Sequence, residues 1–201
     1  MNRHRIGLLL AAIALSAGVG GCSINHFVKD DYPQYLQNNV GASKLPATSF
    51  EAKYEVTPAT AGHKYEFRSV MTGYANNWVV EFGQMLDATL QSKDVQGAFR
   101  KLDKRGTGEV ANLLVFDLIA YSFGDFGAHV EMKVTVQRSG APLVKTYKAD
   151  GVTQGGKMFW AGVFGMKNAI QQSTKDAVDK ILVALITDLN VLPEAGGNRS
   201  Q

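Results

Sequence analysis

Strict alternation of apolar and polar residues marks the middle of the chain. From residue 129 to residue 137 every second side chain is apolar, and those between are polar or charged. This period of two predicts a β-strand with one buried and one solvated face. A turn over 138–142 leads to a second strand at 143–149. The nearly continuous apolar run at 110–121 is typical of a strand buried on both faces, so the three segments predict an antiparallel meander.

Two further segments have apolar residues at spacings of three and four, which places them on one face of a helix. The first helix is expected over 78–92, where the pair Asn76–Asn77 supplies residue types common at helix N-caps. The second is expected over 167–190, and Pro193 would prevent its continuation.

The remaining patterns complete a predicted domain over 50–192. Strands are expected at 50–56 and 64–70, and a brief strand at the apolar patch 95–99, followed by a charged loop at 101–109. The order strand, strand, helix, strands, helix predicts an α+β fold. We expect a mostly antiparallel sheet with two amphipathic helices packed on one face.

The N-terminus has the layout of a secretory signal peptide. A short basic segment, Met1–Arg5, precedes an apolar run, Ile6–Leu15, and a small-residue region that ends at Cys22. The apolar run is too short for a membrane-spanning helix, which needs about 20 residues. A permanent anchor helix is therefore the less favoured interpretation, and residues 1–21 are predicted to be a lipoprotein signal peptide.

The C-terminal end of this signal peptide and the cysteine that follows it resemble a bacterial lipobox, in the order Val19, Gly20, Gly21, Cys22. The resemblance implies that the Cys22 thiol becomes the lipidated N-terminus, with a diacylglyceryl thioether and an added acyl chain such as palmitate. Several acyl chains anchor a protein firmly, whereas one gives only marginal binding. Ser23, which follows the cysteine in place of Asp, implies export to the outer membrane and a location on its periplasmic face.

The two ends of the mature chain lack a clear period. Residues 22–49 are polar and irregular and contain Pro33 and Pro46, so we expect the lipidated cysteine to continue into a flexible tether. Residues 193–201, which include Gly196 and Gly197, are expected to form a disordered tail.

Composition narrows the function classes. The chain of 201 residues carries 21 Lys and Arg against 18 Asp and Glu, and Arg3 and Arg5 belong to the signal. A domain so close to neutrality has no electrostatic reason to bind nucleic acid. Cys22 is the single cysteine, which excludes an intramolecular disulfide and a thiolate zinc cluster. No cofactor and no metal are expected beyond the covalent lipid.

No catalytic constellation stands out, and we expect the protein not to be an enzyme. Asp117 interrupts an apolar strand, but a carboxylate bonded to nearby groups is the favoured interpretation over a perturbed acid or base. His63 and His129 have no partner at metal-ligand spacing. The Asp-Phe-Gly tripeptide within 124–127 lies between two strands and predicts a tight turn.

The most unusual segment is 157–167, which is rich in glycine and large apolar side chains and is flanked by lysines. It fits neither the strand nor the helix period. Two interpretations remain open: a loop that caps the core, and an exposed interface for a partner, a lipid or a second copy. The candidate interface residues are Met158, Phe159, Trp160, Val163, Phe164 and Met166.

The layout as a whole resembles periplasm-facing lipoproteins of the YajG kind and, more distantly, the auxiliary lipoproteins of ABC-type transport systems. The matching features are the lipobox at Cys22, the expected helix at 78–92, the strand Lys145–Ala149 that enters a glycine-rich turn, and the last helix with Asp188 near its end. Such families are non-enzymatic adaptors, assembly factors or accessory parts of envelope machines.

The expected function is therefore that of an outer-membrane-anchored periplasmic lipoprotein with a non-catalytic binding or assembly role. The alternative is an accessory lipoprotein of an ABC-type transport system that binds lipid or apolar cargo. Either function implies contact with the membrane through the acyl chains of Cys22. Either also implies an envelope protein partner or self-association, and no nucleic acid.

Overall fold

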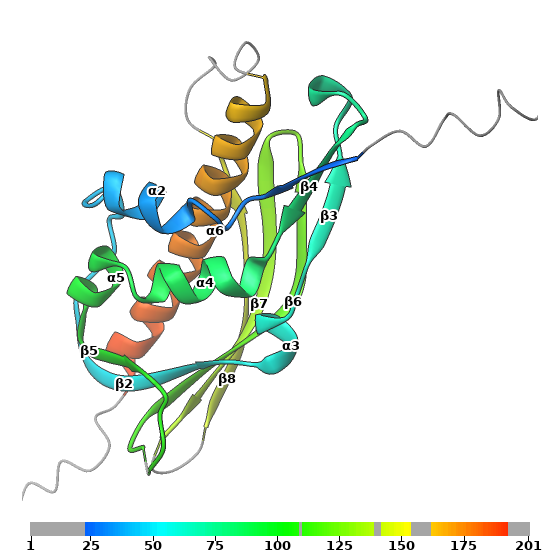
Figure 1. Ribbon diagram of the computed structural model, residues 1–201. Coiled ribbons are helices and arrows are strands. Elements are labelled where there is room, and N and C mark those ends of the chain that lie inside the picture. Colours follow the sequence, from blue (N-terminus) through cyan, green and yellow to red (C-terminus); the bar gives the residue numbers. More distant parts are fainter. Residues whose placement is uncertain (1–22, 109, 139–141, 154–161, 193–201) are drawn as a thin grey trace, which may run out of the picture.

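The computed structural model describes residues 23–108, 110–138, 142–153 and 162–192 (Figure 1). They form a five-stranded sheet with helices against one face, and a smaller three-stranded sheet. In spatial order the strands of the larger sheet are β5 (Phe99–Lys104), β2 (Thr48–Val56), β6 (Leu113–Gly124), β7 (Gly127–Gln137) and β8 (Leu143–Gly151).

The larger sheet is mixed. Strands β5 and β6 both run parallel to β2, whereas β6, β7 and β8 form the expected antiparallel meander. The α+β class is confirmed, and the expectation of a mostly antiparallel sheet is corrected. Parallel neighbours need a long crossover connection, and here the crossover from β2 to β5 contains two strands of the smaller sheet, β3 and β4. Apolar periodicity does not encode strand direction, so the sequence pattern could not specify it.

The helices cover one face of this sheet (Figure 1). The long helix α6 (Gly162–Val191) packs on β7, β8 and β2, and α4 (Phe82–Leu90) lies beside it. Buried side chains at spacings of three and four follow α6, as predicted. The predicted alternation of β7 is also confirmed, because Val130, Met132, Val134 and Val136 are buried. On its other face β7 carries Glu131 and Lys133, which pair with Lys148 and Asp117.

The smaller sheet corrects the prediction of a helix from residue 78. Its order is β1 (Ile24–Phe27), β4 (Asn76–Val80) and β3 (Tyr65–Arg68), so Trp78 lies on a central strand. Trp78 and its two successors are buried in a row, because β4 is paired on both sides and packed. Such a run is compatible with a buried strand as well as with a helix. The helix α4 begins four residues later, at Phe82.

The expectation of a flexible tether over 22–49 is wrong for the part that the structure describes. Residues 24–27 form β1, and α2 (Tyr32–Asn38) follows. Val28, Tyr32 and Leu36 are buried in the core. Three apolar side chains among polar neighbours give a weak pattern, yet their burial fixes the segment to the domain. The signal peptide, Cys22 and the tail 193–201 lie outside the described residues.

The segment 93–104 also differs from its prediction. Residues 93–98 form the helix α5 (Lys93–Ala98), whose N-cap Ser92 accepts a hydrogen bond from Val95 N–H. Residues 99–104 are the edge strand β5 and not a loop. Phe99 and Leu102 point into the core, while the charged residues between and beyond them face solvent. An edge strand tolerates such charges, which prevent pairing with other chains.

The β6–β7 hairpin has a two-residue turn. Asp125 and Phe126 have φ values of 49° and 59°, which is the left-handed geometry that a tight hairpin requires. The turn predicted within 124–127 is confirmed. The prediction that β6 is buried on both faces is wrong for part of the strand. Leu113 and Leu114 are both buried, but Ile119 and Ala120 are exposed on the open face of the sheet.

Candidate functional site

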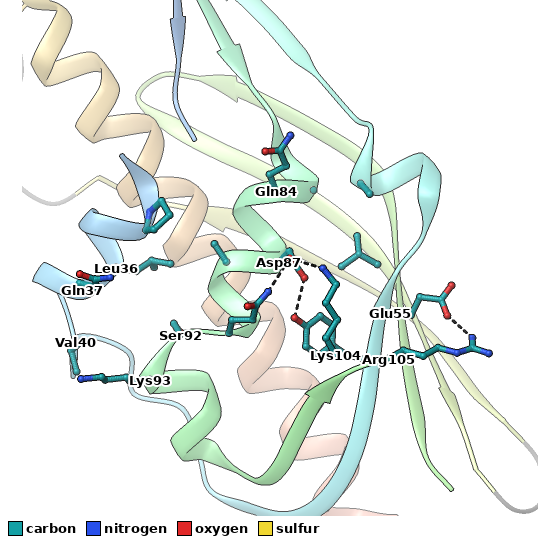
Figure 2. Close-up of a pocket in the computed structure, with 17 residues that line it drawn as sticks. Leu36, Gln37, Val40, Glu55, Gln84, Asp87, Ser92, Lys93, Lys104 and Arg105 are labelled. Atoms are coloured by element: carbon teal, nitrogen blue, oxygen red, sulfur yellow. Dashed lines mark hydrogen bonds and ion pairs between the residues drawn. The ribbon is translucent and has the colours of Figure 1, made fainter. Parts of the chain in front are cut away.

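A pocket of about 940 Å³ lies between α2, α4 and the ends of β2 and β5 (Figure 2). This volume is within the usual range for small-molecule sites, about 300–1,000 Å³. Its apolar wall includes Leu36, Val40, Val56 and Ala88. Several exposed residues line it too, so the pocket opens to solvent.

Asp87 is the polar centre of the pocket. Its Oδ1 accepts a hydrogen bond from Tyr54 Oη at 2.9 Å. Its Oδ2 accepts from Lys104 Nζ at 2.8 Å and from Gln91 Nε2 at 2.9 Å. Figure 2 shows Asp87 turned towards Lys104. Both carboxylate oxygens are therefore engaged by donors from the pocket itself.

The environment of Tyr54 keeps its hydroxyl protonated. Burial raises the pKa of Tyr54 well above its usual value, and the hydrogen bond to Asp87 raises it further. A protonated phenol is a donor, so Tyr54 holds Asp87 in place. Together with Lys104 and Gln91, it occupies three of the about four acceptor positions of the carboxylate.

Cationic side chains surround the mouth of the pocket. Lys104 uses one of its three N–H donors on Asp87, and Lys93 lines the same pocket. Arg105 directly follows β5 and pairs with Glu55 (Figure 2). The pocket thus combines an apolar wall with lysine ammonium groups, which is the chemistry that receives an apolar group with a polar or anionic head.

The residues of the predicted interface are separated by the structure. Met158, Phe159 and Trp160 lie outside the described residues, as does Cys22. Val163, Phe164 and Met166 lie in the first turns of α6. Met166 is buried and Val163 packs against the core, whereas Phe164 is 85% exposed. Within the described part, Met166 therefore belongs to the core and Phe164 to the exposed surface.

Asp117 has the structural environment that the sequence analysis favours. Its carboxylate accepts hydrogen bonds from Lys133 and from Thr57 Oγ1, at 2.7 and 3.0 Å. The Lys133 ammonium lowers its pKa, and the Thr57 hydroxyl adds to this. A carboxylate held ionised in this way is a tie between strands on the open face of the sheet.

The two histidines lie in different surroundings. His129 is exposed and pairs with Asp150 across the β7–β8 ladder. His63 is half-buried, and its ring lies edge-to-face with the Tyr121 ring at 6.4 Å between the ring centroids. Burial lowers the pKa of His63. Among the residues that the structure describes, no three His, Cys, Asp or Glu side chains are grouped so as to hold a metal ion.

The strand at 145–149 and Asp188 of the last helix, both singled out in the sequence, come together in space. Lys145 and Tyr147 of β8 both donate to the carboxylate of Asp188 near the end of α6, at 2.7 and 2.6 Å. The cluster ties the last turns of the helix to the sheet edge. The pocket around Asp87, by contrast, had no signal in the sequence, because its residues come from six elements that only the folded chain brings together.

Comparisons with known proteins find solved structures of low sequence identity. No family model and no curated protein matches the chain. One solved structure, of an uncharacterized protein, is 12% identical, with 72% of this chain and 94% of that chain covered and a TM-score of 0.42. Another is a DUF330 protein from the bacterium Xanthomonas campestris, 15% identical, with 73% and 91% covered and a TM-score of 0.37. No helix within the described ranges is long and apolar enough to cross a membrane.

Proposed function

We propose that the protein is a lipid-anchored component of the bacterial cell envelope with a non-catalytic binding role. The lipobox that ends at Cys22 supports the anchor, and Ser23 supports the outer membrane as its destination, with the domain in the periplasm. The observation that carries the binding role is the pocket around Asp87, whose carboxylate is already held by three donors. A site of this kind is preorganised to receive a ligand or a side chain of a partner.

A second candidate function is that of an accessory lipoprotein of an ABC-type transport system. The apolar wall formed by Leu36, Val40, Val56 and Ala88 favours it, because the acyl chain of a lipid would bury apolar surface there. Lys93 and Lys104 would then accompany an anionic headgroup at the mouth of the pocket.

The anchor is tested by the intact mass of the protein isolated from bacterial membranes. We expect the mass of residues 22–201 plus acyl chains. Cys22→Ala should abolish that added mass and release the protein from the membrane fraction. An unmodified Cys22 in the membrane-extracted protein would refute the anchoring proposal.

The pocket is tested with a fluorescent fatty acid, dansylated undecanoic acid, titrated against the purified protein. Ala88→Trp places a large ring within the pocket, and Val183→Trp, on the exposed side of α6, is its matched control. Cargo binding in the pocket predicts a saturable rise in dansyl emission that Ala88→Trp removes and Val183→Trp leaves unchanged. Absence of binding to the wild-type protein would count against the transport candidate and leave the pocket to a protein partner. Equal loss in both variants would exclude the pocket as the binding site.

A further inference from the structure

One end of the smaller sheet gathers the start of the described chain and the β3–β4 connection. Strand β1 starts there at Ile24, which is paired with Asn76 at the start of the parallel strand β4. Strand β3 ends there at Arg68, which is paired with Asn77. Residues 69–75, including the short helix η1 (Val70–Thr72), therefore project from the same end, as Figure 1 shows.

This end is apolar on its outside. Ile24, Val70, Met71 and Tyr74 are 54%, 72%, 47% and 66% exposed, and we call these four residues the η1 patch. Three of them lie within five consecutive residues of one connection. Large apolar side chains gathered on a surface in this way mark a contact with another molecule or a membrane.

The chain enters the domain directly at the η1 patch. The guanidinium of Arg68 donates to Ser23 Oγ at 3.2 Å and to the carbonyl oxygen of Tyr74 at 3.0 Å. Ile24 N–H donates to the carbonyl oxygen of Ala75 at 2.8 Å. Ser23 is thus tied to the patch, and Cys22 precedes it in the chain by a single peptide bond. Acyl chains on Cys22 would leave the protein at this end.

We propose that the η1 patch rests on the lipid bilayer that receives the acyl chains of Cys22, so that the domain is docked on the membrane and not suspended from a tether. This inference rests on the lipid anchor proposed above. Apolar side chains beside an anchor enter the boundary between headgroups and acyl chains. Tyr74 has the apolar ring and polar tip that suit this boundary. Arg68 brings a positive charge to the level of the lipid phosphates.

The test uses the fact that Cys22 is the only cysteine in the chain. When Cys22 is acylated, a cysteine introduced elsewhere is the only free thiol and can be labelled alone. Met71→Cys places a label in the η1 patch. Val144→Cys, at an exposed position of β8 on the open face of the larger sheet, is the control. Each full-length lipidated variant is labelled with a nitrobenzoxadiazole fluorophore and reconstituted into phosphatidylethanolamine–phosphatidylglycerol vesicles.

The readout is quenching by lipids that carry bromine on their acyl chains, which reports contact with the bilayer interior. We expect the label at position 71 to lose most of its fluorescence in brominated vesicles and the label at position 144 to keep it. Equal quenching at both positions, or none at position 71, would overturn the docking. A label at position 71 that is shielded from water but not quenched by bromine would show contact with a second protein copy and would also overturn it.

The intact mass of each labelled variant separates the two proposals. An acylated protein without quenching at position 71 refutes the docked orientation and leaves the anchor standing. A protein that carries no added acyl mass refutes both the lipid anchor and the docked orientation. Matching thermal unfolding of the two variants, within the same vesicles, shows that neither label has disturbed the fold.

Discussion

Gly151, the last residue of β8, lies directly against the backbone of α6 at Ser173. A Cβ atom at position 151 would fall 1.7 Å from the carbonyl oxygen of Ser173 and 2.9 Å from the amide nitrogen of Ala177. Only a hydrogen fits there. The close approach seats the middle of the long helix on the edge of the sheet, where Ser173 and Ala177 are themselves fully buried.

Gly151→Ala should therefore be strongly destabilising. The methyl group meets backbone atoms, which cannot rotate away, so the helix must move. We expect the free energy of unfolding, measured by urea denaturation, to fall by about 3 kcal/mol. Gly97→Ala in α5 is the matched control, because nothing lies within 4 Å of a Cβ there. It should raise stability by up to about 1 kcal/mol through helix propensity. Similar values for the two variants would contradict the close contact.

The Asp188 cluster predicts a loss of stability in acid. The Lys145 ammonium lowers the pKa of Asp188, and the hydrogen bond from the Tyr147 hydroxyl adds to this. A carboxyl whose pKa is lowered by folding stabilises the protein above its unfolded pKa, about 4, and loses that contribution as the pH falls through the folded value. Asp188→Asn should cost about 1 kcal/mol at pH 7.

The difference between wild type and Asp188→Asn should shrink as the pH is lowered below about 4. Urea denaturation across this range measures it. The exposed carboxyl of Asp103 on β5 serves as the control, and Asp103→Asn should change stability little at any pH. A constant deficit of Asp188→Asn from neutral to acid pH would rule out its ionised form as the stabilising species.

Lys175 and Asp179 form a nearly buried ion pair one turn apart on α6, at 2.6 Å. Burial raises the pKa of Asp179, and the Lys175 charge and the hydroxyl of Ser43 oppose that shift. Lys175→Met removes the principal opposing charge and should raise the pKa further. A carboxyl with a raised folded pKa loses stability as the pH rises through that value.

The deficit of Lys175→Met should therefore be larger at pH 8, about 3 kcal/mol, than at pH 5. Adding Asp179→Leu should restore most of it, because no buried charge is then left without a partner. Thermal or urea unfolding of the single and double variants at both pH values makes the comparison. A double variant as unstable as the single one would show that packing, and not charge, is lost.

Tyr32 tests whether the residues before the larger sheet belong to the fold. Its ring is buried and its hydroxyl is within 2.9 Å of Thr89 Oγ1 on α4. Tyr32→Ala should lower the free energy of unfolding by about 3–5 kcal/mol, as for other buried aromatic residues. Tyr74→Ala, at an exposed ring, should change it by less than about 0.5 kcal/mol. Equal free energies of unfolding of the two variants would show that residues 23–38 do not contribute to the folded domain and act as a tether.

Periodic patterns predicted the elements that have one clear buried face. The alternation of β7 and the stripe of α6 each depend on neighbours a few residues apart in the chain, so they can be read locally. The same reasoning failed at Trp78, because a central strand and a buried helix both appear as apolar runs. It failed at Tyr32 because Val28, Tyr32 and Leu36, although spaced by four, are too few among polar residues to mark an element.

The sequence by itself determined the α+β class, the β6–β7–β8 meander, the last helix and the lipobox-like segment that ends at Cys22. Only the tertiary structure decided that β5 and β6 flank β2 in parallel, that Tyr54, Asp87 and Lys104 share a pocket, and that Ser23 is tied to the η1 patch. The physical reason is the range of the interactions. Helix and strand periods arise from contacts within a few residues, whereas strand order, pockets and surface patches arise from residues that meet only when distant segments pack together.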